Sequence, residues 1–175
     1  MDLNNKFGWQ DIEGWFGHAR IYDQIIRESS KNDTIVEIGT WLGKSSCYLA
    51  SRAKMSGKNV KIVCVDSFRE TLAKFNENMT KAGVIDYINT MVVTPEVASY
   101  NVGYEAVFAV FIDGGEIKDI KNWYPKIKPG GIIAGYSMSI SDSIKKTIES
   151  LGVKEFKEDQ DGVWFARKPQ SVRLN

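Results

Sequence analysis

The chain has 175 residues, of which 43% are hydrophobic and 26% charged, a composition typical of a single soluble globular domain. Its 23 Lys and Arg residues and 22 Asp and Glu residues give a net charge of +1, so charge gives no reason to expect binding to nucleic acid or to an anionic membrane. Only two cysteines occur, which disfavours both a disulfide scaffold and a structural zinc site.

Apolar runs and helical patterns alternate along the first half of the chain. The run Thr34–Ile38 is rich in β-branched residues and is closed by Gly39, which predicts a buried strand. Apolar residues then recur at helical spacing, and Gly57 follows at a usual capping position. Pro95 suits the first turn of a helix. The elements predicted here are strands over 34–38, 60–65 and 88–93, helices over 44–55 and 70–82, and a short helix that begins at Pro95.

The second half of the chain continues the same alternation. The run Ala106–Ile112 is apolar throughout, as expected for a central parallel strand that is covered on both faces. The sequence Lys-Pro-Gly-Gly over Lys128–Gly131 predicts a sharp turn. The remaining predicted elements are a helix reaching 123, a strand over 132–134, a helix over 141–150, and an antiparallel pair over 153–157 and 163–167 around a polar turn at 158–162.

This order of elements predicts one α/β domain over residues 1–175. Strands and helices that alternate with short links indicate a doubly wound, mostly parallel seven-stranded sheet with a C-terminal antiparallel hairpin. We expect residues 31–175 to form the core and residues 1–30 to form a helical lead-in whose aromatic residues make a lid or a homodimer contact. No apolar segment opens the chain and no run is long enough to cross a bilayer, so we expect a cytoplasmic location without membrane contact.

Acidic residues and glycines cluster where the predicted strands end, and ligands of such sheets bind at these ends. Glu37 precedes the glycine-containing loop Gly39–Gly43, Asp66 ends the second strand, and Asp113 ends the fourth. The loop is one residue too short for a P-loop, and Trp41 occupies the place of the second glycine of a dinucleotide motif.

An acidic residue, a two-glycine loop and a second acidic residue suit a ligand with a cationic amino acid end and a ribose. Asp66 stands where a carboxylate accepts hydrogen bonds from ribose hydroxyls, and Phe68 would pack against the base. The alternative is that Glu37 and Asp66 only cap strand ends and that Phe68 belongs to the core.

The segment Val36–Ser46 resembles the first motif of class I S-adenosylmethionine-dependent methyltransferases, and most closely that of methyltransferase family 24, which is related to macrolide and cephalosporin-cluster enzymes. The likeness covers nearly the whole chain and includes the late Pro-Gly-Gly strand. Its further segments are Asp11–Phe16, Asp66–Phe68, Phe111–Gly114, Asp119–Ile120, Trp123, Pro125 and Lys128–Gly135.

The resemblance implies S-adenosyl-L-methionine as cofactor and assigns roles to single residues. Gly39 and Gly43 would pass under its methionine portion, Glu37 would lie near its ammonium, and Asp66 would bind its ribose. Asp113 would point towards the methyl group as the catalytic residue. The other implied cofactor contacts are Thr40, Ser45, Ser67, Phe68, Thr94 and Pro95.

The sequence departs from the family's pattern at two places that, in many members, look like a divalent-metal site and a base. The His-x-Tyr-Glu segment expected before Asp119 is missing, and Ser137 stands where the family carries Asp. We therefore expect no catalytic metal, and we expect Glu116 to be a solvated charge at a helix start. His18, the only histidine, is expected to pack or to be exposed, not to act as a base.

Three functions remain open at this point. The first is methyl transfer to oxygen or nitrogen of a small-molecule acceptor, with Asp113, Tyr136 and Ser137 on the acceptor side and Trp15 or Trp41 as pocket walls. The second is a protein that binds S-adenosylmethionine without catalysis and has a regulatory role. The third, a nucleoside triphosphatase, is disfavoured by the loop spacing.

Overall fold

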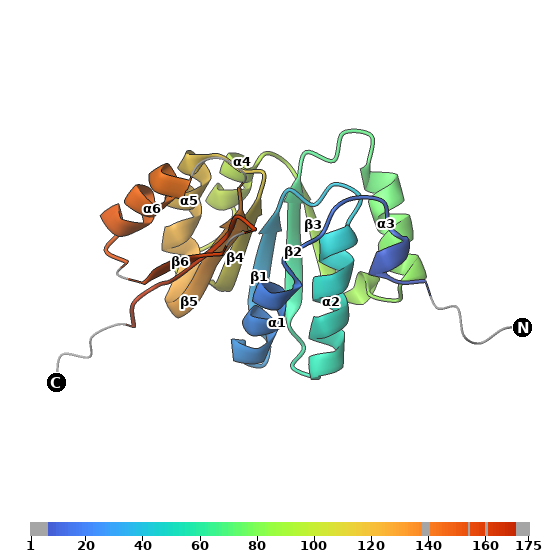
Figure 1. The fold of residues 1–175 in the computed structure, drawn as a ribbon. Coiled ribbons are helices and arrows are strands. Elements are labelled where there is room, and N and C mark those ends of the chain that lie inside the picture. Colours follow the sequence, from blue (N-terminus) through green and yellow to red (C-terminus); the bar gives the residue numbers. More distant parts are fainter. Residues whose placement is uncertain (1–6, 138–140, 154, 160, 171–175) are drawn as a thin grey trace, which may run out of the picture.

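A central sheet organises the chain, as the computed structural model shows for residues 7–137, 141–153, 155–159 and 161–170 (Figure 1). Its seven strands follow the order β3-β2-β1-β4-β5-β7-β6; β1 to β5 are parallel, and β7 runs antiparallel to both of its neighbours. The strands are β1 (Thr34–Ile38), β2 (Lys61–Asp66), β3 (Ile88–Val92), β4 (Val107–Asp113), β5 (Ile127–Tyr136), β6 (Phe156–Glu158) and β7 (Val163–Arg167).

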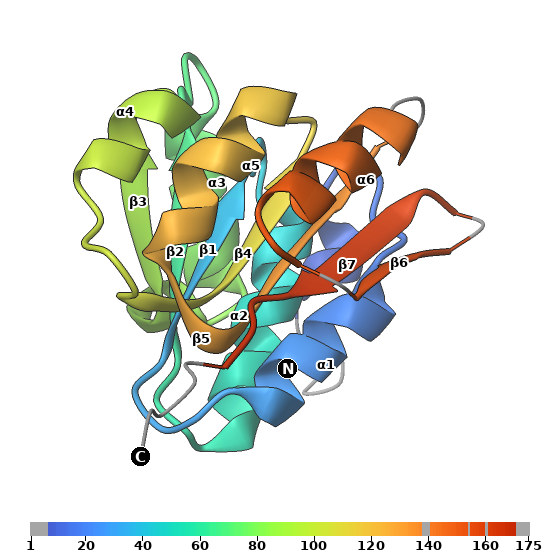
Figure 2. The same cartoon turned by 90° about the vertical axis from the view of Figure 1, so that its left-hand side faces the viewer.

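Helices cover both faces of the sheet (Figure 2). The first three α-helices and the lead-in pack on one face and the last three on the other, and each face has its own buried apolar cluster. The helices are α1 (Ala19–Glu28), α2 (Lys44–Ser56), α3 (Leu72–Lys81), α4 (Pro95–Tyr100), α5 (Ile117–Trp123) and α6 (Ser141–Ser150), with short 3-10 helices η1 (Trp9–Asp11), η2 (Ile85–Tyr87) and η3 (Tyr124–Lys126). The predicted doubly wound fold is thus confirmed.

The side-chain alternation of β1 decides which face receives each residue. Ile35 belongs to the cluster under α1, α2 and α3, whereas Val36 and Ile38 belong to the cluster under α4, α5 and α6. Full burial of such a side chain contributes about 1.5–3 kcal/mol to stability. A shift of β1 by one residue would move these side chains to the opposite face, so this register is strongly favoured. Glu37 consequently points towards α1 and α2, into an otherwise apolar layer.

One predicted element is wrong. Residues Lys128–Gly131 do not form a sharp turn but lie inside β5, where the register with β4 shifts between Val107 and Ala109. A Cβ atom on Gly131 would stand 2.4 Å from the carbonyl oxygen of Phe108, so glycine allows the two backbones to approach at this irregularity. Pro-Gly-Gly is compatible with a bulge as well as with a turn, and the strand pairing decided between them.

The other elements lie close to their predicted positions. The predicted strand over 153–157 begins at Phe156, and its residue 154 lies outside the described part of the chain, as does residue 160 of the predicted turn. In the lead-in, Trp9 and Phe16 both pack against Tyr48 of α2. None of the helices described in the structure has the length and apolarity needed to cross a membrane.

Candidate functional site

The candidate site lies where the strand order reverses. β1 stands between β2 and β4, and the chain continues outward through β2 and β3 before it returns to β4 on the other side. Ligands of open α/β sheets bind at such a point, beyond the carboxyl ends of the strands. Asp66 ends β2 and Asp113 ends β4, so the two carboxylates flank the loop that leaves β1.

Gly39 lets this loop leave the sheet between its two neighbours. Its φ is +83°, and its N–H donates to the carbonyl oxygen of Val65 at 3.0 Å. A Cβ atom at this position would lie 2.1 Å from the carbonyl oxygen of Asp113. Only glycine fits both the backbone angle and the space, so the first glycine of the motif has a steric reason.

The carboxylate of Asp66 holds the loop from the other side. One oxygen, Oδ2, accepts the backbone N–H groups of Thr40 at 3.0 Å and of Trp41 at 2.9 Å. The second oxygen, Oδ1, accepts the N–H of Phe68 at 2.9 Å, and the hydroxyl of Ser67 lies 3.5 Å from it. A carboxylate can accept about four hydrogen bonds, and the contact with Ser67 is the longest of the four, so a ligand hydroxyl can take its place on Oδ1.

Helix α3 closes over the far end of the loop. Gly43 has a φ of +86°, and a Cβ atom there would stand 2.7 Å from Met79 Cε and 2.8 Å from the ring of Phe75. The side-chain amide of Asn78 donates to the carbonyl oxygen of Leu42 at 2.9 Å. The second glycine of the motif therefore serves close packing between the loop and α3.

Lys44, the lysine that follows the loop, does not face a phosphate position. Its Nζ donates to the carbonyl oxygen of Ile12 in the lead-in at 2.8 Å. A P-loop lysine must instead reach towards the phosphates of a bound nucleotide. The geometry therefore agrees with the loop spacing in disfavouring a triphosphate site.

Glu37 is fully buried and its two oxygens already accept hydrogen bonds. Oε1 accepts from the hydroxyl of Tyr22 in α1 at 2.6 Å, and Oε2 accepts from the hydroxyl of Ser46 in α2 at 2.5 Å. Burial raises the pKa of Glu37, although hydrogen bonds from Ser45, Ser46 and Tyr22 act in the opposite direction. Glu37 therefore connects β1 to the two helices, and the structure gives it no exposed surface.

Asp113, the carboxylate that ends β4, has a raised pKa. Burial, and secondarily the nearby charge of Glu37, raise the pKa of Asp113 from 3.8 to about 6. In the loop that follows β1, the hydroxyl oxygen Oγ1 of Thr40 is buried and has no hydrogen-bond partner among the described residues. A partly buried acid of this kind can exchange a proton near neutral pH.

The remaining predicted cofactor contacts divide into two groups. Ser67 and Thr94 are exposed, and they follow β2 and β3, which are paired through Asp66 and Val92. Phe68, by contrast, is 1% exposed and packs edge-on against Phe75 with ring centroids 5.1 Å apart. The structure thus brings the polar contacts to one edge and places Phe68 in the core, which is the alternative that the sequence left open.

Three of the predicted cofactor contacts, Thr94, Pro95 and Ser45, stand at the starts of helices. Thr94 caps α4 by accepting the N–H of Val97 at 3.4 Å, and Pro95 occupies the first turn of the same helix. Ser45 is 6% exposed at the start of α2. Ser45 follows the loop because α2 begins directly after it, and Thr94 and Pro95 follow β3 because α4 begins there.

Around Asp113, the candidate metal positions Glu116 and Ser137 can be placed in the described part of the chain. Glu116 is an exposed side chain that pairs with Lys118 at 3.2 Å, and its backbone N–H donates to Asp119. Ser137 follows the end of β5 and is partly exposed. Within the described residues, no group of three or more His, Cys, Asp or Glu side chains is placed to hold a metal ion.

Sequence reasoning missed Tyr22, which supports the site from α1. Tyr22 lies fifteen residues before Glu37, and no motif spacing links the two. His18 stacks on Phe111 with ring centroids 4.5 Å apart, and Trp15 lies 4.5 Å from the ring of Tyr136. The amphipathic pattern of α1 predicts a buried face, but it does not indicate which strand residue that face meets.

Trp15 and Trp41, the two predicted pocket walls, are both exposed near the strand ends. Their exposed fractions are 56% and 47%. Gly14 lies against the Trp41 ring, since a Cβ atom there would stand 3.1 Å from Trp41 Cζ3. The lead-in therefore brings apolar surface to the same edge as Asp113.

Comparison with known proteins gives one family and many similar folds. The profile of the methyltransferase domain family, number 24, matches residues 36–135. No curated protein matches the chain. A SAM-dependent O-methyltransferase from Thermotoga maritima superposes with a TM-score of 0.70 and 18% identity, covering 90% of this chain and 68% of that one.

Two further solved structures illustrate the range of proteins with this fold. A protein assigned as an rRNA methylase from Clostridium thermocellum has a TM-score of 0.68 and 16% identity, with 91% of this chain and 100% of that chain covered. The cyclase SpnF has a TM-score of 0.66 and 11% identity, with 87% and 82% covered. At these identities the likeness shows the fold alone.

Proposed function

The chain belongs to methyltransferase family 24, a family of class I S-adenosylmethionine-dependent methyltransferases, and from this premise we propose that it methylates an oxygen or nitrogen of a small-molecule acceptor. One observation carries the proposal: the loop Gly39–Gly43 leaves the sheet between Asp66 and Asp113, at the switch point of the strand order.

The residues at this point fit S-adenosylmethionine. Asp66 Oδ1 can accept a ribose hydroxyl in place of its long contact with Ser67, and Thr40 Oγ1 is a buried hydroxyl without a partner among the described residues. Ser67 and Thr94 stand exposed on the adenine side. Glu37 enters the proposal as the residue that fixes α1 and α2 around the loop, since its oxygens are occupied by Tyr22 and Ser46.

Asp113 is the residue that we expect to act on the acceptor. The bound cofactor supplies a methyl group on a sulfonium, which a nucleophile can attack directly. With a pKa of about 6, Asp113 is largely ionised at pH 7 and can take a proton from an acceptor hydroxyl or amine. Trp15, Trp41 and Tyr136 would hold the acceptor in line, and such positioning supplies much of the rate of a bimolecular reaction.

We also propose that the transfer needs no divalent metal. Magnesium prefers several oxygen ligands, usually with one or two carboxylates. Here Glu116 pairs with Lys118 in solvent, Ser137 replaces the family's Asp, and Glu37 is occupied by Tyr22 and Ser46, so Asp113 would be the one carboxylate left at the candidate metal positions that the structure describes. These residues support a methyl transfer that depends on the alignment of the acceptor with the methyl group and on Asp113 as the base. A cytoplasmic location and a homodimer remain predictions from the sequence.

Titration calorimetry with S-adenosylmethionine and S-adenosylhomocysteine, each with Mg²⁺ and with a chelator, tests the proposal. We expect micromolar binding, about −8 kcal/mol, that does not depend on Mg²⁺. Methyl transfer to a panel of hydroxylated and amino compounds then distinguishes an enzyme from a protein that only binds. Absence of binding by the folded protein, or tighter binding of Mg²⁺ and a nucleoside triphosphate, would overturn the cofactor assignment.

A further inference from the structure

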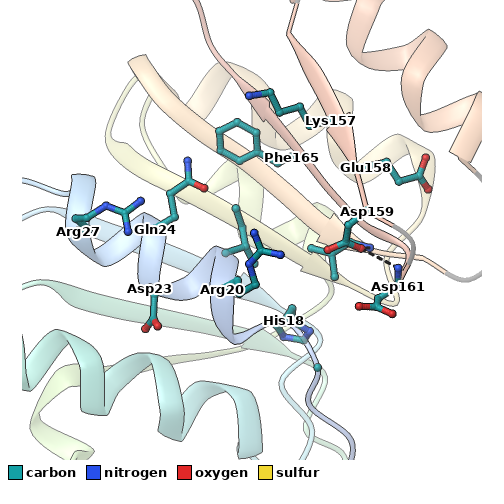
Figure 3. A pocket seen from close by; sticks show the side chains of 13 residues that line it. His18, Arg20, Asp23, Gln24, Arg27, Lys157, Glu158, Asp159, Asp161 and Phe165 are labelled. Atoms are coloured by element: carbon teal, nitrogen blue, oxygen red, sulfur yellow. Dashed lines mark hydrogen bonds between the residues drawn. The ribbon is translucent and has the colours of Figure 1, made fainter.

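A cavity of about 500 Å³ lies between α1 and the β6–β7 hairpin (Figure 3). None of the predicted cofactor contacts lines it. On one side α1 presents Arg20, Gln24 and Arg27, which share a helix face because they are four and three residues apart. On the other side the hairpin presents Lys157 and the ring of Phe165. Its volume suits a small organic ligand.

Three exposed cations line this cavity. Arg20, Arg27 and Lys157 form no ion pair with another described residue. The acid on the same side, Asp23, is already occupied by Arg52 at 2.7 Å. The lining holds four acids beside its three cations, but Asp23 is occupied by Arg52, so the guanidinium groups on α1 are free to meet a negatively charged ligand.

Three of the four acidic side chains of the lining, Glu158, Asp159 and Asp161, lie at the hairpin and away from Arg27, whereas the fourth, Asp23, belongs to α1 (Figure 3). Asp159 belongs to the turn itself, because its carboxylate accepts the N–H groups of Asp161 and Val163, each at 3.0 Å. Glu158 and Asp161 are exposed to water. Arg27 therefore lies away from the acids of the hairpin, and the acid that shares its helix, Asp23, is paired with Arg52.

A buried imidazole completes the lining. His18 is 2% exposed, and neither of its ring nitrogens has a hydrogen-bond partner among the described residues. Burial lowers its pKa to about 4, so the ring is neutral at pH 7 and can both donate and accept one hydrogen bond. Buried polar atoms without a partner are rare in folded proteins, and a ligand in the cavity would provide one.

His18 also connects the cavity with the candidate reaction site. Its ring stacks on Phe111 at 4.5 Å and 27°, and Phe111 lies two residues before Asp113 in β4. Tyr136, at the end of the neighbouring strand β5, is 6.5 Å away. A ligand along α1 would thus approach the carboxyl ends of β4 and β5.

We propose that this cavity binds an organic anion, a carboxylate or a phosphate on an apolar body, with the oxyanion at Arg20 and Arg27 and the body between Phe165 and His18. The guanidinium fork suits the paired oxygens of either group. We further infer that this anion is part of the methyl acceptor, an assignment that rests on the proposed function.

The test uses benzoate and phenyl phosphate as anionic probes and benzyl alcohol as a neutral one, titrated into the full chain at low salt. Benzyl alcohol cannot form the charged hydrogen bonds of the two anions, so we expect its affinity to be lower by about tenfold or more. The anions should also shift the imidazole resonances of His18, which is the only histidine and therefore reports its own surroundings in an NMR spectrum.

Arg20→Gln and Arg27→Gln should each weaken the binding of both anions about tenfold. Lys146→Gln, which removes an exposed cation from α6 on the other face, should leave it unchanged. Equal binding of benzyl alcohol and benzoate, or wild-type affinity in both Arg variants, would overturn the site. S-adenosylmethionine titrated into the same variants should bind as in the wild type. Its failure to bind the wild type would overturn the proposed function but not the anion site.

Discussion

Asp66 accepts the backbone N–H of Trp41 at 2.9 Å, and through this bond the end of β2 determines the course of the loop that follows β1. The same oxygen accepts the N–H of Thr40. The carboxylate thus shapes the loop before any ligand is bound, while its other oxygen can still accept a hydroxyl. Loop conformation and ligand recognition are therefore coupled at one side chain.

Asp66→Ala should weaken S-adenosylmethionine binding by about 1–3 kcal/mol, the range typical of hydrogen bonds to a charged group. Titration calorimetry measures this loss. Asp86→Ala, which removes an exposed acid from η2, is the matched control and should bind as the wild type does. Unchanged affinity in Asp66→Ala would exclude the ribose assignment.

Asp113→Asn should lower the rate of methyl transfer about 10²–10⁴-fold, because it removes the proposed proton acceptor. The affinity for S-adenosylmethionine should change little. In the wild type the rate should fall below about pH 6, as the carboxylate becomes protonated. The range from pH 5 to pH 8 brackets the pKa of Asp113, which is about 6. A rate that does not change across this range, or an active Asp113→Asn variant, would contradict the role of Asp113.

The raised pKa of Asp113 should also appear in stability. Between 3.8 and about 6 the folded chain retains a proton that the unfolded chain has lost, so the free energy of unfolding falls as pH rises through this window. The loss from this residue is at most about 3 kcal/mol. Urea unfolding of the wild type and of Asp113→Asn across the window isolates it, because the other groups titrate in both. Parallel pH curves would show that the pKa of Asp113 is normal.

Gly39→Ala should destabilise the fold by about 2–5 kcal/mol, because the strain of a positive φ adds to a clash with the backbone of Asp113. Gly114→Ala is the control: its φ is +68°, but a Cβ atom there would meet nothing within 4 Å. We expect it to cost only about 1–2 kcal/mol. Thermal and urea unfolding compare the two, and equal losses would show that the close approach at Gly39 is relieved by a small shift.

Tyr22→Phe should cost about 1–3 kcal/mol of stability, because it leaves a buried oxygen of Glu37 without its donor. Tyr48→Phe removes a similar bond to Asp23, which keeps Arg52 and is partly exposed, and should cost less. Urea unfolding of the two variants measures the difference. A larger loss in Tyr48→Phe would mean that the buried contact is satisfied in another way.

Local patterns were sufficient to predict most of the fold. The apolar run Thr34–Ile38 and the continuous run that becomes β4 form buried parallel strands, since side-chain period and burial are decided over a few residues. Lys128–Gly131 shows the limit of such patterns. Proline and glycine there indicate an irregular backbone, and only the pairing of β5 with β4 made it a bulge and not a turn.

The sequence by itself also determined the strand-end chemistry: Asp66 and Asp113 end strands because the apolar runs end there, and Glu37 lies one residue before the end of β1. Only the tertiary structure decided how these carboxylates differ. Glu37 is fully buried, Asp66 accepts hydrogen bonds from the backbone of the loop, and Asp113 is half-buried. The tertiary structure alone also brought α1 and the hairpin around one cavity. The physical reason is that burial and hydrogen bonding depend on neighbours far away in the chain, and no local spacing encodes them.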